Sequence, residues 1–408
     1  MPTTNALIDK TNGLAAATLA NQTGISKPVS KFMSSLFIQW LSVSGRYNFI
    51  NLARYGKYSE QSLRNGFERG FNFFNFMLSL IQSKSACERI LAFDPSYISK
   101  SGKQTFGIGR YWSGVAQQTK HGLELCCLAA VDVVRHTAFH LVAKQTPGAA
   151  QLATMKMNHV SFYASIIKEH IAQLLLISKY LVVDAYFMKK DFIEPMVKLD
   201  LQVITKMRTD ANMRYAFNGK QNTGRGRKIK YGKKVDFKKI DKRIWKKFDT
   251  NDTIECYYAT LWCVTLKCMV QNIYVLDTKT KRYEILLCTD LELEPKKIVQ
   301  YYRLRFQIEF LIRDAKQHAG LEHCQARSKN KLDFHFNMAL TTVSLVKIAC
   351  QKTIGQEQNQ PFSMLSVKRL FHNDFIVQFI FSNLAVDQSC KKIKQLYHRC
   401  LNIGSLAA

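Results

Sequence analysis

The apolar segments change in character at residue 90, and this change constrains the fold more than any other feature of the sequence. Residues 32–86 carry the apolar periodicity of helices. From Ile90 onward come short apolar runs typical of strands, with helical segments between the later ones: ILAFDPSYI, GLELCCLAAVDVV, TAFHLVAKQT, YLVVDAYF and LQVITKMR. We expect the second and third runs to form an antiparallel pair. Strands first, then strands alternating with helices, predict an α/β fold with a mixed sheet flanked by helices.

The segment 209–290 departs from this alternation. It opens with basic residues and continues with runs rich in Tyr, Val, Ile and Cys, so we predict a β-rich insertion. A helix follows, with Pro295 suited to its first turn and Gly320 suited to its end. We therefore expect a helical N-terminal DNA-binding region at 1–88, a core at 89–208 and 291–352, the insertion at 209–290 and a helical C-terminal region at 353–408.

The charge of the chain indicates its partner. The 408 residues include 59 Lys+Arg against 30 Asp+Glu, a formal net charge of +29. So many positive charges repel one another, and this repulsion is usually offset by a bound polyanion. The charge therefore predicts binding to nucleic acid.

Other composition features bear on the compartment. The best apolar run is interrupted by Lys179 and Asp184, and no basic segment followed by an apolar one opens the chain, so we expect neither membrane association nor secretion. The 11 cysteines include no CxxC pair. This favours reduced thiols in the cytoplasm over a disulfide framework or a zinc site.

Four polar residues share one face of the helix predicted from Pro295 to about Ala319. Tyr302, Arg305, Glu309 and Lys316 lie at offsets 0, 3, 7 and 14, which fall within a stripe of about 60°. A carboxylate there suits a metal ion, and the cations and hydroxyl beside it suit phosphate oxygens. The alternative is that this stripe is simply the wet face of an amphipathic helix.

Two aspartates mark the ends of apolar runs. Asp94 interrupts LAF-Asp-Pro, where we expect the strand to break, and Asp184 ends YLVV. A carboxylate in such a place is costly unless it is paired or binds a cation. With Glu309 they provide three oxygen donors of the kind that Mg²⁺ or Mn²⁺ prefers. Singly, Asp94 is also compatible with a turn and Asp184 with a helix cap.

Residues 45–70 are compatible with a helix-turn-helix. A turn near Gly56 would precede a second helix opened by Ser59, which presents Arg64 and Arg69. An ordinary helical hairpin with a basic face explains the pattern equally well.

A second basic element opens the insertion. Residues 220–247 hold 13 Lys/Arg and two acids. We expect this cluster to hold DNA without sequence preference, whereas the alternative is a solvated loop. Its expected DNA contacts are Arg225, Arg227, Lys228, Lys233 and Lys234.

With these motifs the chain resembles the DDE transposases of bacterial insertion sequences, in particular the family with a Y-R-E-K signature. That signature is Tyr, two residues, Arg, three residues, Glu, six residues and Lys. Tyr302, Arg305, Glu309 and Lys316 match every position and every gap.

The two aspartate segments extend the resemblance, which covers roughly residues 90–350. Asp184 followed by Ala185 and an aromatic residue is similar to the second-aspartate motif of the family. FDPSYISKSGK, with Asp94 and the Gly102-Lys103 pair, is similar to the first, although Pro95 departs from the usual pattern.

The resemblance implies an RNase H-like catalytic core interrupted by the insertion. It implies that Asp94, Asp184 and Glu309 are catalytic and hold two Mg²⁺ or Mn²⁺ ions, without a small-molecule cofactor. The residues expected to bind DNA phosphates near the cut are Tyr302, Arg305, Lys316 and Lys103. The expected partner is double-stranded DNA, as transposon ends and target, bound by a homodimer in the synaptic complex of a bacterial cytoplasm, at the nucleoid.

Two other functions fit parts of the sequence. An RNase H-like nuclease that cuts without joining would need the same metal ligands. A non-catalytic DNA-binding protein would use residues 45–70 and would not need the three carboxylates.

Overall fold

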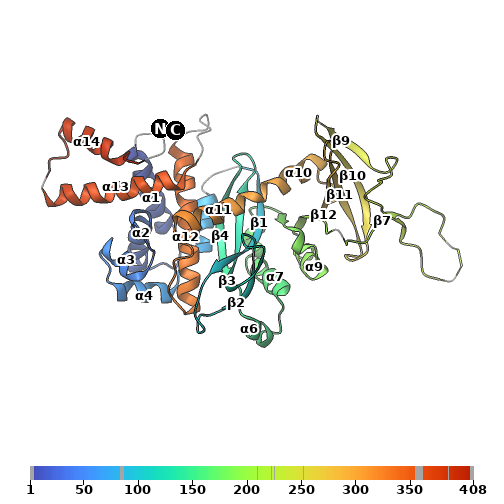
Figure 1. Ribbon diagram of the computed structural model, residues 1–408, viewed down its shortest axis with the longest axis horizontal. Coiled ribbons are helices and arrows are strands. Elements are labelled where there is room, and N and C mark those ends of the chain that lie inside the picture. The colour runs from blue at the N-terminus through green and yellow to red at the C-terminus, as the bar shows by residue number, and fades with distance from the viewer. Residues whose placement is uncertain are drawn as a thin grey trace.

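In the computed structural model of this chain, the helices of both ends lie on one side of a central sheet and the insertion lies on the other (Figure 1). The structure describes residues 4–82, 87–208, 210–221, 223–224, 226–250, 252–353, 362–384 and 386–404. Within these ranges no helix is long and apolar enough to cross a membrane.

The elements follow the predicted order. The N-terminal helices are α1 (Thr4–Ala20), α2 (Lys27–Ser42), α3 (Phe49–Arg54), α4 (Glu60–Arg69) and α5 (Phe73–Gln82). The first strands are β1 (Arg89–Ser99), β2 (Gly109–Ser113), β3 (Gln118–Asp132) and β4 (Thr137–Gln145). Next come α6 (Ala149–Thr154), α7 (His159–Glu169), α8 (Ile171–Leu175), β5 (Tyr180–Val183), the short 3₁₀-helix η1 (Ala185–Phe187), α9 (Lys190–Val197) and β6 (Gln202–Lys206).

The insertion and the C-terminal half complete the chain. The insertion holds β7 (Met213–Ala216), β8 (Tyr231–Lys234), β9 (Lys246–Thr250), β10 (Ile254–Cys263), β11 (Cys268–Asp277) and β12 (Tyr283–Cys288). The helices that follow are α10 (Pro295–Leu304), α11 (Phe306–His318), α12 (Lys329–Thr353), α13 (Met364–Asn383) and α14 (Lys391–Leu401).

Five strands form the core of the sheet in the order β4-β3-β1-β5-β6. The strand β3 is antiparallel to both of its neighbours, β4 and β1, whereas β1, β5 and β6 are parallel. This mixed sheet with helices at both ends is an RNase H-like α/β core. The predicted fold class and the predicted antiparallel pair are confirmed.

The first strand is longer than the sequence predicts. We expected β1 to break at Asp94, but it continues through Pro95 to Ser99, opposite Gly122 of β3. Pairing with β5 stops at Ala92, and no described strand pairs with that side of β1 beyond this point. A proline is tolerated in a strand with such a free edge.

The insertion extends the same sheet. Leu286, Leu287 and Cys288 of β12 pair with β6, and the order then continues β12-β11-β10-β7-β8. The predicted β-rich insertion is therefore present, and one 12-stranded sheet runs through both parts. The exact boundaries of the four regions stay a prediction.

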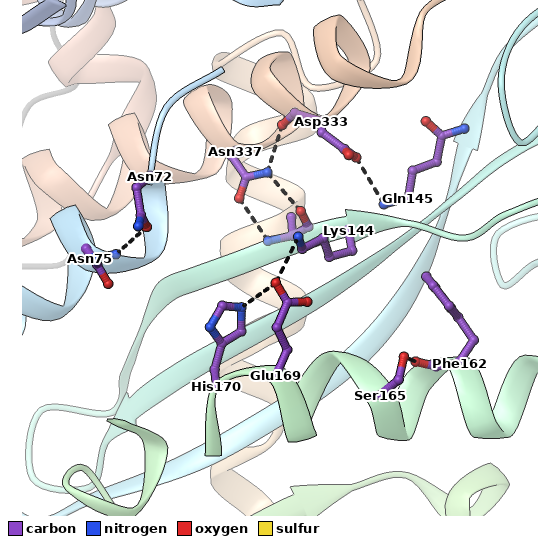
Figure 2. A network of polar contacts seen from close by, with 11 residues as sticks. Asn72, Asn75, Lys144, Gln145, Phe162, Ser165, Glu169, His170, Asp333 and Asn337 are labelled. Atoms are coloured by element: carbon purple, nitrogen blue, oxygen red, sulfur yellow. Dashed lines mark hydrogen bonds and ion pairs between the residues drawn. The ribbon is translucent and has the colours of Figure 1, made fainter. Parts of the chain in front are cut away.

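The helix α12 covers the free edge of β4. Asn337 accepts a hydrogen bond from the Ala143 N–H (2.9 Å) and donates one to the Ala143 carbonyl (2.8 Å), as a neighbouring strand would (Figure 2). Nearby, the Ser344 hydroxyl accepts from the His140 N–H and Asp333 accepts from the Gln145 N–H. These side chains pair the backbone of an edge strand that would otherwise be unsatisfied.

Candidate active site

The sheet brings Asp94 and Asp184 to neighbouring positions. In the parallel pair of β1 and β5, Leu91 lies beside Leu181 and Ala92 beside Val182. Continuing that register two residues brings Asp94 level with Asp184. Neighbouring strands lie about 4.8 Å apart, and the charge of Asp184 contributes to a raised pKa of Asp94.

The backbone around Asp184 is fixed on both sides. One carboxylate oxygen accepts a hydrogen bond from the Tyr186 N–H at 2.8 Å and caps η1. The carbonyl of Asp184 accepts a bond from the Thr205 hydroxyl of β6 at 2.7 Å. Asp184 is therefore a cap, as one interpretation of the sequence held, and its second carboxylate oxygen is still available to a ligand.

Arg305 connects the third carboxylate to the first. Its guanidinium lies 2.9 Å from a carboxylate oxygen of Glu309 and 3.7 Å from one of Asp94. The Arg305 side chain is only 8% exposed, whereas that of Glu309 is 44% exposed. Asp94 and Glu309 thus face one buried cation, from a strand and from a helix.

The acidic side chains influence the pKa of Asp94. Burial, above all, raises the pKa of Asp94 to about 8, and the negative charges of Asp184 and Glu309 raise it further, against the opposing effect of Arg305. An additional positive charge beside such a carboxyl group would stabilise its ionised form.

Arg305 also marks a break in the predicted helix. The segment forms two helices, α10 and α11, which meet at this residue. The prediction of a single helix is therefore wrong. The local bonds run over three residues, from the Arg305 N–H to Tyr302 and from the Ile308 N–H to Arg305, which is the tighter 3₁₀ pattern. Tyr302 and Glu309 of the polar stripe still contact Arg305 across this junction.

The other two members of the stripe flank the carboxylates. Tyr302 is buried, which raises the pKa of its hydroxyl to about 12, and its ring lies 6.0 Å from the Arg305 guanidinium. Lys316 donates to the carbonyl of Tyr97 at 2.6 Å and lies 3.4 Å from Glu322. Lys316 therefore approaches β1 three residues beyond Asp94.

Two helices, α3 and α4, occupy the segment for which the sequence is compatible with a helix-turn-helix or with an ordinary hairpin. Ser59 caps α4 by accepting a hydrogen bond from the Ser62 N–H. Arg64, however, pairs with Glu60 and lies 4.7 Å from the centre of the Phe49 ring. Arg69 is exposed and lines a groove with Lys27. Of the two predicted DNA contacts on α4, Arg69 is thus the one without such an ion pair.

The remaining predicted DNA contacts lie on the surface. Lys103 is exposed in the segment between β1 and β2. Of the five DNA contacts predicted in the basic cluster, Arg227, Lys228, Lys233 and Lys234 are exposed, whereas Arg225 lies outside the described residues. Their roles stay predictions.

One acidic residue escaped the sequence interpretation. Glu124 of β3 accepts hydrogen bonds from the hydroxyls of Tyr163 (2.6 Å) and Thr146 (2.8 Å), and its charge contributes to the raised pKa of Asp94. The sequence feature that could have revealed Glu124 is its position inside the apolar run GLELCCLAA, where an unpaired charge is unfavourable.

The donor set fits a hard divalent cation, provided that Arg305 moves. Among the described residues, no three His, Cys, Asp or Glu side chains stand ready to hold a metal ion. The guanidinium of Arg305 instead contacts two of the oxygen donors, those of Asp94 and Glu309. Three carboxylates, one within β1, one at the end of β5 and one on α11, are nevertheless the ligand type that Mg²⁺ and Mn²⁺ prefer.

Comparison with known protein families decides the identity. The family model described as "Transposase DDE domain" matches residues 86–345, more than half of the chain. The chain belongs to the DDE transposases. The matched span of this transposase includes all three carboxylates and the whole sheet, so the enzyme is one that processes DNA in transposition. No curated protein matches the transposase.

Proposed function

We propose that this transposase cuts DNA at the ends of a mobile element and joins the freed ends to target DNA. In the first step a water molecule attacks a phosphodiester, the bond to the 3′ oxygen breaks, and a 3′-hydroxyl is released. In the second step this hydroxyl attacks a target phosphodiester, so that one bond forms as another breaks. The observation that carries the proposal is the register that brings Asp94 level with Asp184, with Glu309 tied to Asp94 through Arg305.

Asp94, Asp184 and Glu309 would hold two divalent cations, Mg²⁺ or Mn²⁺. Such ions, when bound, promote deprotonation of the attacking oxygen and stabilise the leaving one. Arg305, released from the carboxylates, would then bind phosphate oxygens, for which its planar guanidinium is suited. The Tyr302 hydroxyl, neutral at physiological pH because its pKa is about 12, would donate a hydrogen bond beside it.

Several finer assignments accompany this proposal. The complete Y-R-E-K spacing supports membership of that subfamily, with Lys316 and Lys103 as further phosphate contacts. The exposed cations Arg227, Lys228, Lys233 and Lys234 would hold DNA without sequence preference. We also propose two protomers per synaptic complex, one at each element end, which light scattering of the complex with end DNA would test.

The catalytic assignment is tested by Glu309→Gln, which keeps the shape of the side chain and removes its charge. We expect loss of Mg²⁺-dependent cutting of supercoiled plasmid by at least about 100-fold, a typical loss for one removed group that stabilises the transition state. Glu292→Gln is the matched control, because Glu292 is exposed and lies before α10. Near-normal cutting by the Glu309 variant would show the assignment to be wrong.

Joining is tested separately from cutting. A pre-cut end with a free 3′-hydroxyl is incubated with target plasmid and Mg²⁺. A transposase joins the two, whereas a nuclease of the same fold leaves the end unjoined. Cutting without any joining would favour the nuclease.

A further inference from the structure

Trp112 of β2 is unusually exposed for a tryptophan. Its side chain is 56% exposed, whereas Trp40 and Trp245 are buried and Trp262 is half-buried. Its neighbour Tyr111 is 6% exposed. Such an exposed aromatic residue beside a buried one indicates that one face of the local sheet is covered and the other is open.

The covered face is the one that holds Tyr111. The Tyr111 hydroxyl donates to the Gly107 carbonyl at 2.9 Å, and its ring lies 6.4 Å from that of His159, at the start of α7. On the other face, Arg110 pairs with His121 and Trp112 pairs with Thr119 of β3. All four of these residues are exposed. Residues 109–121 thus form a two-stranded ribbon with one open face.

The open face of the ribbon lies on the same side of β3 as the side chain of Asp94, and the residues of that side between them, Leu123 and Leu125, are buried. Asp94 pairs with Cys127, and the register of β3 runs without a shift from there to β2. Because strand side chains alternate, Cys127, His121 and Thr119 lie on one face. Since residues opposite one another in a pair share a face, Arg110 and Trp112 lie on the same face as Asp94.

The strand register gives the distance from the ribbon to the candidate active site. His121 and Thr119 are six and eight residues from Cys127 along β3, which is roughly 20 and 26 Å at about 3.3 Å per residue. A DNA strand advances about 3.4 Å per nucleotide. The ribbon would therefore meet a duplex roughly six to eight base pairs from a phosphate held at Asp94.

The charge of the segment favours an anionic partner. Residues 95–123 contain four Lys or Arg, namely Lys100, Lys103, Arg110 and Lys120, and no Asp or Glu. A two-stranded β-ribbon has the dimensions to enter the major groove of DNA. An aromatic side chain beside an arginine is a combination that packs on bases and sugars while the cation binds phosphate.

We propose that the open face of the β2–β3 ribbon, formed by Arg110, Trp112, Thr119 and His121, binds duplex DNA six to eight base pairs from the cut. Arg110 contacts a phosphate and Trp112 packs against the sugars or bases of the groove. The proposal rests on the proposed function, because it takes a duplex whose cut phosphate lies at Asp94 to extend toward the end of β3 that carries the ribbon.

The test measures binding without catalysis. The full chain in EDTA is titrated with a duplex of mixed sequence about 30 base pairs long, well beyond the estimated span. We expect Trp112→Ala and Arg110→Ala each to weaken binding by at least about fivefold, the low end for removal of one stacked aromatic side chain. Trp112→Phe should keep most of the affinity. The matched control is Val134→Ala, an exposed apolar residue in the β3–β4 turn at the opposite end of β3.

Tryptophan emission provides a second readout. Iodide should quench the exposed Trp112, and DNA should protect it, so the protection should vanish in Trp112→Phe. The proposal would be overturned if Trp112→Ala bound DNA with unchanged affinity and if DNA did not reduce the iodide quenching of the parent protein. That result is distinct from a failure of the proposed function, which would appear as normal plasmid cutting by Glu309→Gln.

Discussion

Arg305 lies between two of the three candidate catalytic carboxylates, at a junction of two helices. With 8% of its side chain exposed, it is the positive charge that lies closest to Asp94 among the ion pairs of the described chain. A divalent ion bound by Asp94 and Glu309 would compete with this guanidinium. The proposed function therefore implies two states of Arg305, one paired to the carboxylates and one free to bind DNA.

Arg305→Gln tests this competition. Without metal we expect the variant to unfold more easily by about 1–3 kcal/mol, since hydrogen bonds to charged groups are removed. Added Mn²⁺ should raise the unfolding temperature of the variant more than that of the parent, because no guanidinium must be displaced. Thermal unfolding of both proteins with and without Mn²⁺ measures this. Equal shifts in the two would contradict the competition.

The raised pKa of Asp94 predicts how metal-free stability depends on pH. The folded pKa is about 8 and the ordinary value is 3.8. Between these values the folded state holds a proton that the unfolded state has released, so stability falls as pH rises through this window. Asp94→Asn cannot lose that proton. Its stability relative to the parent should therefore rise by at least about 1 kcal/mol, one pKa unit, between about pH 5 and pH 9.

Urea unfolding in EDTA at several pH values measures this difference for the parent and Asp94→Asn. A constant difference over the whole range would show that burial and like charge do not act on Asp94 as described.

At the scale of elements, α12 stabilises the sheet by pairing with the edge of β4. Asn337 is 6% exposed and binds both backbone groups of Ala143. Asn337→Ala should leave these groups unpaired and lower the free energy of unfolding by about 1–3 kcal/mol. Asn330→Ala, at an exposed position of the same helix where the amide donates to Glu68, is the control and should lower stability less, because its hydrogen bonds are exposed to water. Urea unfolding compares them, and equal effects would contradict the pairing role.

The same scale separates what local sequence predicts from what it does not. The apolar runs predicted β3 and β4 correctly, and Ser59 predicted the start of α4. The continuation of β1 through Pro95 was missed because it depends on pairing with β3, a segment distant in sequence. The helix junction at Arg305 was missed because residues 304–306 contain neither Gly nor Pro, the usual local signals.

For the whole molecule, a single sheet joins the core to the insertion through β6 and β12. The sequence predicted the order of the three carboxylates but not this continuity. The strand β6 ends at Lys206 and β12 ends at Cys288, some 80 residues later. Strands so far apart pair only when the tertiary fold brings them together, and no local sequence pattern indicates such pairing. The position of Arg305 between Asp94 and Glu309 was unpredictable for the same reason.

The net charge of +29 predicts steeply salt-dependent DNA binding. Replacing Lys228, Lys233 and Lys234 by Gln should reduce the slope of log affinity against log salt concentration by about 2 to 3, near 0.9 for each DNA phosphate that the variant no longer neutralises. Fluorescence anisotropy over a range of sodium chloride concentrations measures this slope.

A matched triple variant provides the control. Lys190, Lys198 and Lys206 each pair with a glutamate, at 3.6, 3.1 and 3.2 Å. Their replacement by Gln should leave the slope nearly unchanged. Equal slopes in the two triple variants would show that the basic cluster has no special part in DNA binding.

The central claim is that Asp94, Asp184 and Glu309 hold the same metal ions. Iron-mediated cleavage of the polypeptide tests it directly, because Fe²⁺ occupies sites for Mg²⁺ and Mn²⁺ and generates radicals that cut the chain nearby. We predict cuts close to all three residues, suppressed by excess Mg²⁺ and abolished together in Asp94→Asn. Cuts near only one of the three, or cuts that persist unchanged in Asp94→Asn, would contradict a shared site.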